Sequence, residues 1–124
     1  MANNEKTILV IDDEEGACDF VKSFLEAREY TVLTTSSGKE GIDIIKTKNP
    51  RLVLLDMRMP EMNGLDVLTE LKKNNIIANI YLMTGVEEGE ELDKAKALGI
   101  KGILKKPVQL QGPSYKRTLQ QIKI

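Results

Sequence analysis

Five short apolar runs alternate along the chain with segments whose apolar residues recur at helical spacing. The first run, residues 7–11, is continuous and rich in β-branched side chains, which is typical of a strand buried on both faces. Each run of this kind predicts one strand of a sheet. The other four are residues 31–35, 52–55, 80–83 and 102–105.

The intervening segments carry helix signals. The second helix is expected to begin at Ser37, because Glu40 three residues later completes a capping-box pattern. The fourth is expected to end at Gly99, and Pro113 suits the first turn of the fifth. The apolar positions are Ala17, Phe20, Val21, Phe24 and Leu25; Ile42 and Ile45; Leu65, Leu68 and Leu71; Leu92, Ala95 and Leu98; and Tyr115, Leu119 and Ile122.

Strands that alternate with helices five times predict an α/β fold. The expected architecture is a doubly wound, five-stranded parallel sheet with helices on both faces. The pattern runs without a linker or a repeat, so we expect one domain over residues 1–124.

Composition narrows the function without naming it. The net charge is −1, which gives no basic surface for nucleic acid, and no apolar run approaches the roughly 20 residues that span a bilayer. Residues 1–6 are polar and are not a signal peptide. The one cysteine, Cys18, cannot form an internal disulfide, which fits a cytoplasmic location. It is expected to be packed or partly exposed rather than reactive.

The sequence contains no histidine. This excludes a Ser-His-Asp triad and an ordinary zinc site within the chain. Any chemistry must therefore use carboxylates, lysines and hydroxyls.

Polar residues follow four of the five predicted strands. Parallel sheets bind ligands at the carboxyl ends of their strands, so these residues are expected to converge. Any one of them alone has an ordinary role as a cap, turn or solvated residue, and only their agreement favours a site. They are Asp12 and Asp13 after the first strand, Asp56 after the third, Thr84 after the fourth, and Lys105 and Lys106 at the fifth.

Three carboxylates in one place repel one another unless a cation neutralises them. Mg²⁺ suits such a site, because it binds through one or two carboxylates and keeps several waters. A carboxylate nucleophile, a metal ion, an ammonium and a hydroxyl together suit phosphoryl transfer.

In this order and spacing, the residues resemble the receiver domain of bacterial two-component response regulators. The resemblance covers essentially the whole chain, and the combination of motifs is specific although each is short. The matching stretches are residues 10–14 (VIDDE), 54–64 (LLDMRMPEMNG), 83–85 (MTG) and 105–107 (KKP).

The resemblance implies the strand order 2-1-3-4-5 and a role for each polar residue. Asp56 is the implied phosphoacceptor. The implied Mg²⁺ ligands are Asp12, Asp13, Asp56 and the backbone carbonyl of Arg58. Thr84 is the implied switch hydroxyl, and Lys106 is the implied phosphoryl-binding lysine because it directly precedes Pro107 across a cis peptide bond.

The resemblance also implies the partners. A histidine kinase or a histidine phosphotransfer protein would supply the phosphoryl group, and a downstream protein would read it. The domain itself is expected to bind neither nucleic acid nor membrane, and to be a monomer or a weak dimer. It is not expected to be an enzyme beyond self-catalysed phosphoryl transfer and slow autodephosphorylation.

Three other functions bear on the same residues. A receiver segment of a longer DNA-binding regulator or hybrid kinase is compatible with the same residues. A hydrolase of the haloacid dehalogenase type needs a second Asp two positions after the nucleophile, where this chain has Arg58. A flavodoxin-like nucleotide binder needs a Gly-rich phosphate loop after the first strand, and none is present there.

Two positions depart from the family pattern, and one acidic run has a simpler interpretation. Ile103 stands where the family often has an aromatic residue, and Gly112-Pro113 interrupts the expected start of the last helix. An in–out swing of an aromatic ring is therefore unavailable, and we expect changes on phosphorylation to concentrate in residues 85–89 and the fourth helix. Glu87, Glu88, Glu90 and Glu91 are interpreted as a solvated helix start.

Overall fold

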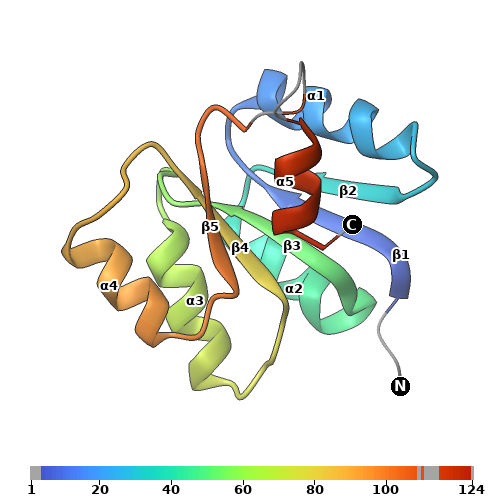
Figure 1. Ribbon diagram of the computed structural model, residues 1–124. Coiled ribbons are helices and arrows are strands. Elements are labelled where there is room, and N and C mark those ends of the chain that lie inside the picture. The colour runs from blue at the N-terminus through green and yellow to red at the C-terminus, as the bar shows by residue number, and fades with distance from the viewer. Residues whose placement is uncertain (1–3, 109, 111–114, 124) are drawn as a thin grey trace.

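The computed structural model describes residues 4–108, 110 and 115–123. Strands and helices alternate from one end of these residues to the other, as expected (Figure 1). The strands are β1 (Asn4–Ile11), β2 (Thr31–Thr35), β3 (Pro50–Asp56), β4 (Ile80–Thr84) and β5 (Gly102–Lys105). The helices are α1 (Glu15–Glu26), α2 (Gly38–Lys48), α3 (Gly64–Lys73), α4 (Glu90–Ala97) and α5 (Tyr115–Gln121).

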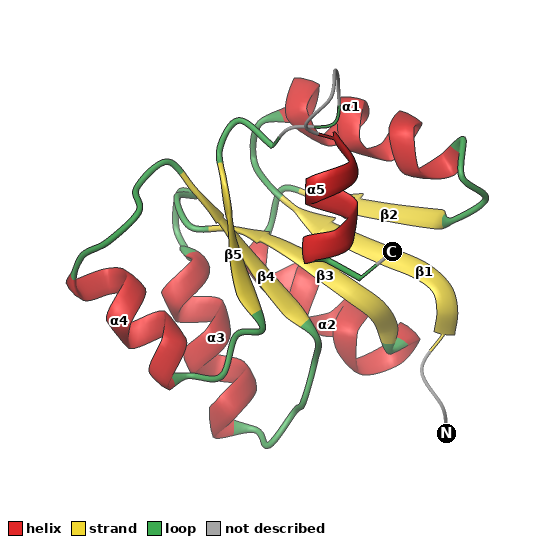
Figure 2. Ribbon diagram, in the orientation of Figure 1, coloured by secondary structure: helices red, strands yellow, loops and turns green. Residues whose placement is uncertain are grey.

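All five strands are parallel and lie in the order β2-β1-β3-β4-β5, which confirms the predicted fold (Figure 2). The register aligns the carboxyl ends of neighbouring strands. Ile11 of β1 pairs with Leu55, Asp56 pairs with Met83, and Thr84 pairs with Lys105. The polar residues that follow these strands therefore meet along one edge of the sheet.

Successive residues of each strand face opposite sides of the sheet, and helices cover both sides (Figure 1). In β1, Leu9 and Ile11 pack with α2, α3 and α4, whereas Ile8 and Val10 pack with α1 and with Ile122 beside α5. Burial on both faces explains why the central strands β1, β3 and β4 carry continuous apolar runs, whereas the edge strand β2 is partly exposed.

The helix starts differ in part from the prediction. At α2 only half of the expected capping box forms: Ser37 Oγ accepts from the backbone N–H of Glu40 at 3.2 Å. The N–H of Ser37 is already engaged, because it donates to Thr35 Oγ1 at 3.1 Å. The complete capping box is at α3, between Asn63 and Asp66.

The structure also bears on the predictions made for α4, α1 and the start of α5. Gly99 follows α4 with φ of 95°, a left-handed conformation that favours glycine and ends the helix there. On α1, Phe20 was expected to pack in the core but is 39% exposed. Residues 112 and 113 lie outside the described residues. None of the described helices has the length and apolar content needed to cross a bilayer.

Candidate functional site

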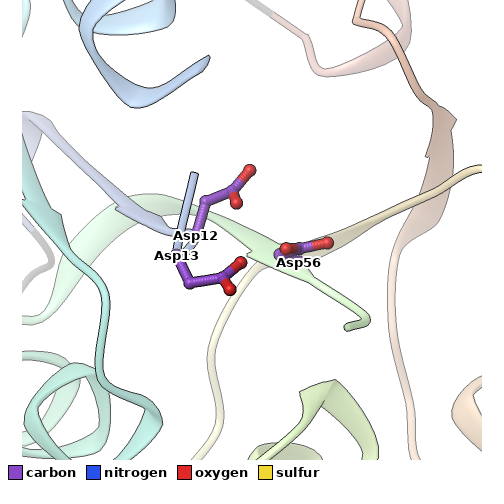
Figure 3. Close-up of side chains that lie close together, drawn as sticks. All are labelled: Asp12, Asp13 and Asp56. Atoms are coloured by element: carbon purple, nitrogen blue, oxygen red, sulfur yellow. The ribbon is translucent and has the colours of Figure 1, made fainter. Parts of the chain in front are cut away.

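Three aspartates gather at the carboxyl edge of the sheet, where β1 and β3 lie side by side (Figure 3). Asp56 is the last residue of β3, and Asp12 and Asp13 directly follow β1. One carboxylate oxygen from each lies within 4.8 Å of the other two. Asp12 and Asp56 are buried, at 2% and 3% exposure, whereas Asp13 is exposed.

Lys106 reaches into this cluster from the end of β5. Its Nζ lies 3.1 Å from Asp56 Oδ1 and 3.2 Å from Asp12 Oδ2. Its backbone N–H donates to the carbonyl of Thr84 at 2.8 Å, and its bond to Pro107 is cis, as the resemblance implied. The preceding Lys105 pairs instead with Glu87, outside the cluster.

The cluster holds more negative charge than its lysine balances. Burial, and then the neighbouring Asp12, raise the pKa of Asp56 from 3.8 to about 6 against the lowering effect of Lys106. Burial acts to lower the pKa of Lys106, but contacts with Asp56 and Asp12 outweigh it and raise that pKa. Buried carboxylates that share a single ammonium form a donor set that suits a hard divalent cation.

Thr84 and Arg58 border the cluster without joining it in this structure. The Thr84 hydroxyl is buried and accepts from the backbone N–H of Val86 at 3.3 Å. The backbone N–H of Arg58 donates to Asp56 Oδ1 over a long 3.4 Å, so its main chain lies at the site. The Arg58 side chain pairs with Glu91 of α4.

The acidic start of α4 is more than the solvated run predicted from the sequence. Glu91 accepts two hydrogen bonds from Arg58, at 2.5 and 3.3 Å, and Glu87 pairs with Lys105 at 2.5 Å. Both acidic residues therefore contact a cation on a strand end or loop that borders the site. Helix-start acidity was visible in the sequence, but partners 33 and 18 residues away were not.

Gly64 is a second residue whose role at the site the sequence interpretation missed. A Cβ added there would lie 2.9 Å from the Asp56 carbonyl oxygen and 3.0 Å from Met57 Cα. The Gly64 N–H donates to the Met57 carbonyl at 2.9 Å, so the start of α3 closes directly on the Asp56 loop. The Asn63-Gly64 pair was the available signal for this close approach.

Cys18 lies behind the cluster and has a packing role, as expected. Its Sγ donates to the backbone carbonyl of Asp12 at 3.3 Å. Burial, and then the charge of Asp12, raise the pKa of the thiol to about 11. A thiol that stays protonated at neutral pH is a poor nucleophile.

A hollow of about 650 Å³ opens beside the cluster, between the first half of α1 and the segment after β5. Phe20 and Ala17 form its apolar wall on α1, and Val108 and Leu110 form the facing wall. Asp12 and Lys106 also line it. The site is therefore approached across a partly apolar surface.

Comparisons with known proteins agree with this geometry. Residues 8–112 match the response regulator receiver domain family. The response regulator SaeR of Staphylococcus aureus (strain NCTC 8325) is 36% identical over 101 residues, which is 81% of this chain and 43% of SaeR. The chain thus spans less than half the length of this relative.

Solved structures show the same fold. A CheY-like receiver domain protein from Methanospirillum hungatei JF-1 superimposes with a TM-score of 0.83 at 27% identity, over 97% of this chain and 92% of that one. The chemotaxis response regulator CheY4 of Vibrio cholerae gives a TM-score of 0.82 at 23% identity, over 96% and 99%. On its motifs, its fold and these matches, the chain belongs to the response regulator receiver domain family, the phosphorylation-dependent signalling domains of two-component systems.

Proposed function

We propose that Asp56 accepts a phosphoryl group and that its phosphorylated and free forms are the two states of a signalling switch. One observation carries the proposal: Asp56 ends buried β3 within reach of two further carboxylates and 3.1 Å from the ammonium of Lys106. A carboxylate held among groups that can neutralise phosphoryl charge is suited to attack phosphorus.

In the proposed step, one Asp56 carboxylate oxygen forms a bond to phosphorus while the bond from phosphorus to the donor breaks. Lys106 keeps the carboxylate oriented before transfer and then pairs with a phosphoryl oxygen. Thr84 follows the strand residue that pairs with Asp56, and its hydroxyl can leave the Val86 N–H to donate to another phosphoryl oxygen. That movement would carry the state of Asp56 into the loop after β4.

The residues present fit Mg²⁺. Asp12, Asp13 and Asp56 offer carboxylate oxygens within 4.8 Å of one another, and the pKa of Asp56 is raised first by burial and then by the neighbouring Asp12. These three residues, with the backbone carbonyl of Arg58, would hold the ion. When bound, Mg²⁺ supplies positive charge that offsets the repulsion between the carboxylates and the incoming phosphoryl group.

The phosphoryl group must come from outside these 124 residues, because they contain no histidine to carry a phosphoramidate. We propose a histidine kinase or a histidine phosphotransfer protein, which would act in the cytoplasm. The hollow beside Lys106 supports a protein donor, since Phe20 offers exposed apolar surface next to the site. A downstream protein would read the loop after β4, and the domain is proposed to act as a monomer or a weak dimer.

Receiver domains are signalling domains rather than classical enzymes. We propose that the only catalysis here is self-catalysed: transfer onto Asp56, and slow hydrolysis of the acyl phosphate by water. The exposed Asp13 side of the cluster leaves a route for that water.

A second candidate is that residues 1–124 act as the receiver segment of a longer regulator. The observation that favours it is that the chain aligns with only 43% of SaeR. In that case the proposed chemistry at Asp56 is unchanged, and the reader of the switch is another part of the same polypeptide. The full reading frame distinguishes the two.

The test of the proposal is intact mass spectrometry after incubation with acetyl phosphate and Mg²⁺. The wild-type chain should gain the mass of one phosphoryl group, and Asp56→Asn should gain none. Asp66→Asn, which alters a carboxylate engaged in capping α3, is the matched control and should be phosphorylated normally. An undiminished mass shift in Asp56→Asn would refute the assignment.

A further inference from the structure

The Arg58 side chain starts at the phosphorylation site and leaves it. Its backbone N–H contacts Asp56 Oδ1, and it is the second residue after Asp56. Its guanidinium nevertheless binds both carboxylate oxygens of Glu91, which lies in the first turn of α4. The guanidinium of Arg58, a long and flexible side chain beside an anionic site, is thus bound by a residue of α4.

The pair with Glu91 is specific in geometry but weak in energy. Two hydrogen bonds give it a bidentate form, whereas the side chains are 70% and 39% exposed to solvent. Exposed ion pairs of this kind contribute little, so a competing anion of similar strength can displace one partner. A phosphoryl group on Asp56 is such an anion, because it adds about two negative charges close to Arg58.

We propose that Glu91 is a positioning residue that holds Arg58 away from the phosphoryl group and thereby shortens the lifetime of the phosphorylated state. This inference rests on the proposed phosphorylation of Asp56. While Arg58 is bound to Glu91, water has access to phosphorus. When Arg58 is released, its guanidinium pairs with the phosphoryl oxygens and occupies the approach of the attacking water.

The same pair links the site to α4. Each time Arg58 turns to the phosphoryl group, Glu91 loses its partner and the first turn of α4 loses a contact with the Asp56 loop. This route needs no aromatic ring at Ile103, which lies half-buried against the core on the α4 side of the sheet. Turnover and the response of α4 therefore share one side chain.

The chain contains a matched control for this inference. Glu87 forms a similar exposed ion pair from the same segment, but its partner is Lys105, which does not contact the cluster. Removing the charge of Glu87 changes the local charge by the same amount without releasing Arg58. An effect that belongs to Arg58 should therefore appear with Glu91→Gln and be absent with Glu87→Gln.

The experiment measures the decay of phosphorylated Asp56 by intact mass after acetyl phosphate is removed, in the presence of Mg²⁺. The variants are Glu91→Gln, Arg58→Ala, their double mutant and Glu87→Gln. Glu91→Gln should lengthen the lifetime about two- to fivefold, the range expected from the free energy of an exposed pair. In the Arg58→Ala background the same substitution should have no effect, since the interaction it releases is gone.

A direct readout separates positioning from a general loosening of α4. The Arg58 Nε–H resonance should shift on addition of beryllofluoride, and in Glu91→Gln it should occupy the shifted position more completely. An unchanged or shortened lifetime in Glu91→Gln, or a lengthening that persists without Arg58, would overturn the inference. Failure of every variant to gain phosphoryl mass would instead overturn the proposed function, so the two failures are distinguishable.

Discussion

The two sides of the site differ in burial: buried strand ends form one side, and exposed ion pairs form the other. On the β1 and β3 side, Asp12 and Asp56 end strands that are buried on both faces, and they are themselves almost inaccessible to solvent. On the β4 and α4 side, Glu87 and Glu91 are held through side chains that are 39–72% exposed. Disrupting the first side costs buried core, and disrupting the second costs only surface ion pairs.

This difference suits the two tasks of a switch. A nucleophile must be held in place, which a strand end between two helical layers provides. A reporter must change its contacts at small cost, which short α4 provides with only Leu92 and Ala95 buried. We therefore call the β1 and β3 side the rigid side and the β4 and α4 side the mobile side, and we expect substitutions on the two sides to differ in effect.

The largest effect should come from the burial of the Asp56 carboxylate beside Asp12, on the rigid side. The pKa of Asp56 rises from 3.8 to about 6 on folding, so the folded state binds a proton more tightly than the unfolded state. The stability that this proton confers is present below pH 4 and is lost as the pH rises through about 6. The difference corresponds to about 3 kcal/mol.

Asp56→Asn should therefore stabilise the metal-free protein at pH 7 by about 3 kcal/mol relative to its effect at pH 3.5. Urea unfolding in a chelator at both pH values measures this difference directly. Saturating Mg²⁺ should stabilise the wild type more than the variant. An equal effect of the substitution at both pH values would mean that the folded site tolerates the charged carboxylate.

A smaller loss should follow from filling the contact between the Asp56 loop and α3. In Gly64→Ala the new Cβ would meet backbone atoms at 2.9 and 3.0 Å, and backbone cannot turn aside as a flexible side chain can. We expect a loss of about 1–3 kcal/mol in the free energy of unfolding, together with slower phosphorylation because Asp56 is displaced.

Gly16→Ala is the control for that substitution. Gly16 lies in α1 and has no other atom within 4 Å of an added Cβ, so alanine should be neutral or stabilising there. Equal urea midpoints for Gly64→Ala and the wild type would show that the rigid side yields more easily than its packing suggests.

The fold was predictable because the central strands carry continuous apolar runs and the helices have apolar residues at helical spacing. The strand ends were predictable for the same reason, and they bring together Asp12, Asp13, Asp56 and Lys106. The roles of these residues, and those of Thr84 and the Arg58 carbonyl, stay predictions. The apolar pattern predicted only where the carboxyl end of each strand lies.

The mobile side was less predictable because its contacts join residues far apart in sequence. Sequence composition does not show whether the glutamates at the start of α4 are solvated or paired, because the fold is what brings Arg58 to Glu91. Phe20 fits the helical period of α1 but lines the hollow and is 39% exposed, since periodicity does not show which part of an apolar face stays uncovered. The capping box of α3 joins residues three apart, Asn63 and Asp66, so it could have been predicted from the sequence, but it was not.

The smallest effect should come from Glu87→Gln. Lys105 lowers the pKa of Glu87, so the pair is intact at neutral pH, but both side chains are largely exposed. The unfolding midpoint should not change measurably, while amide hydrogen exchange in residues 86–89 should become faster and that of β1 and β3 should not. Because salt screens exposed ion pairs, about 1 M NaCl should produce the same faster exchange in the wild type and change the exchange of the variant little. Faster exchange that also reaches β3 would contradict the division between the two sides, because it would show that an exposed pair on the α4 side supports the strand that presents Asp56.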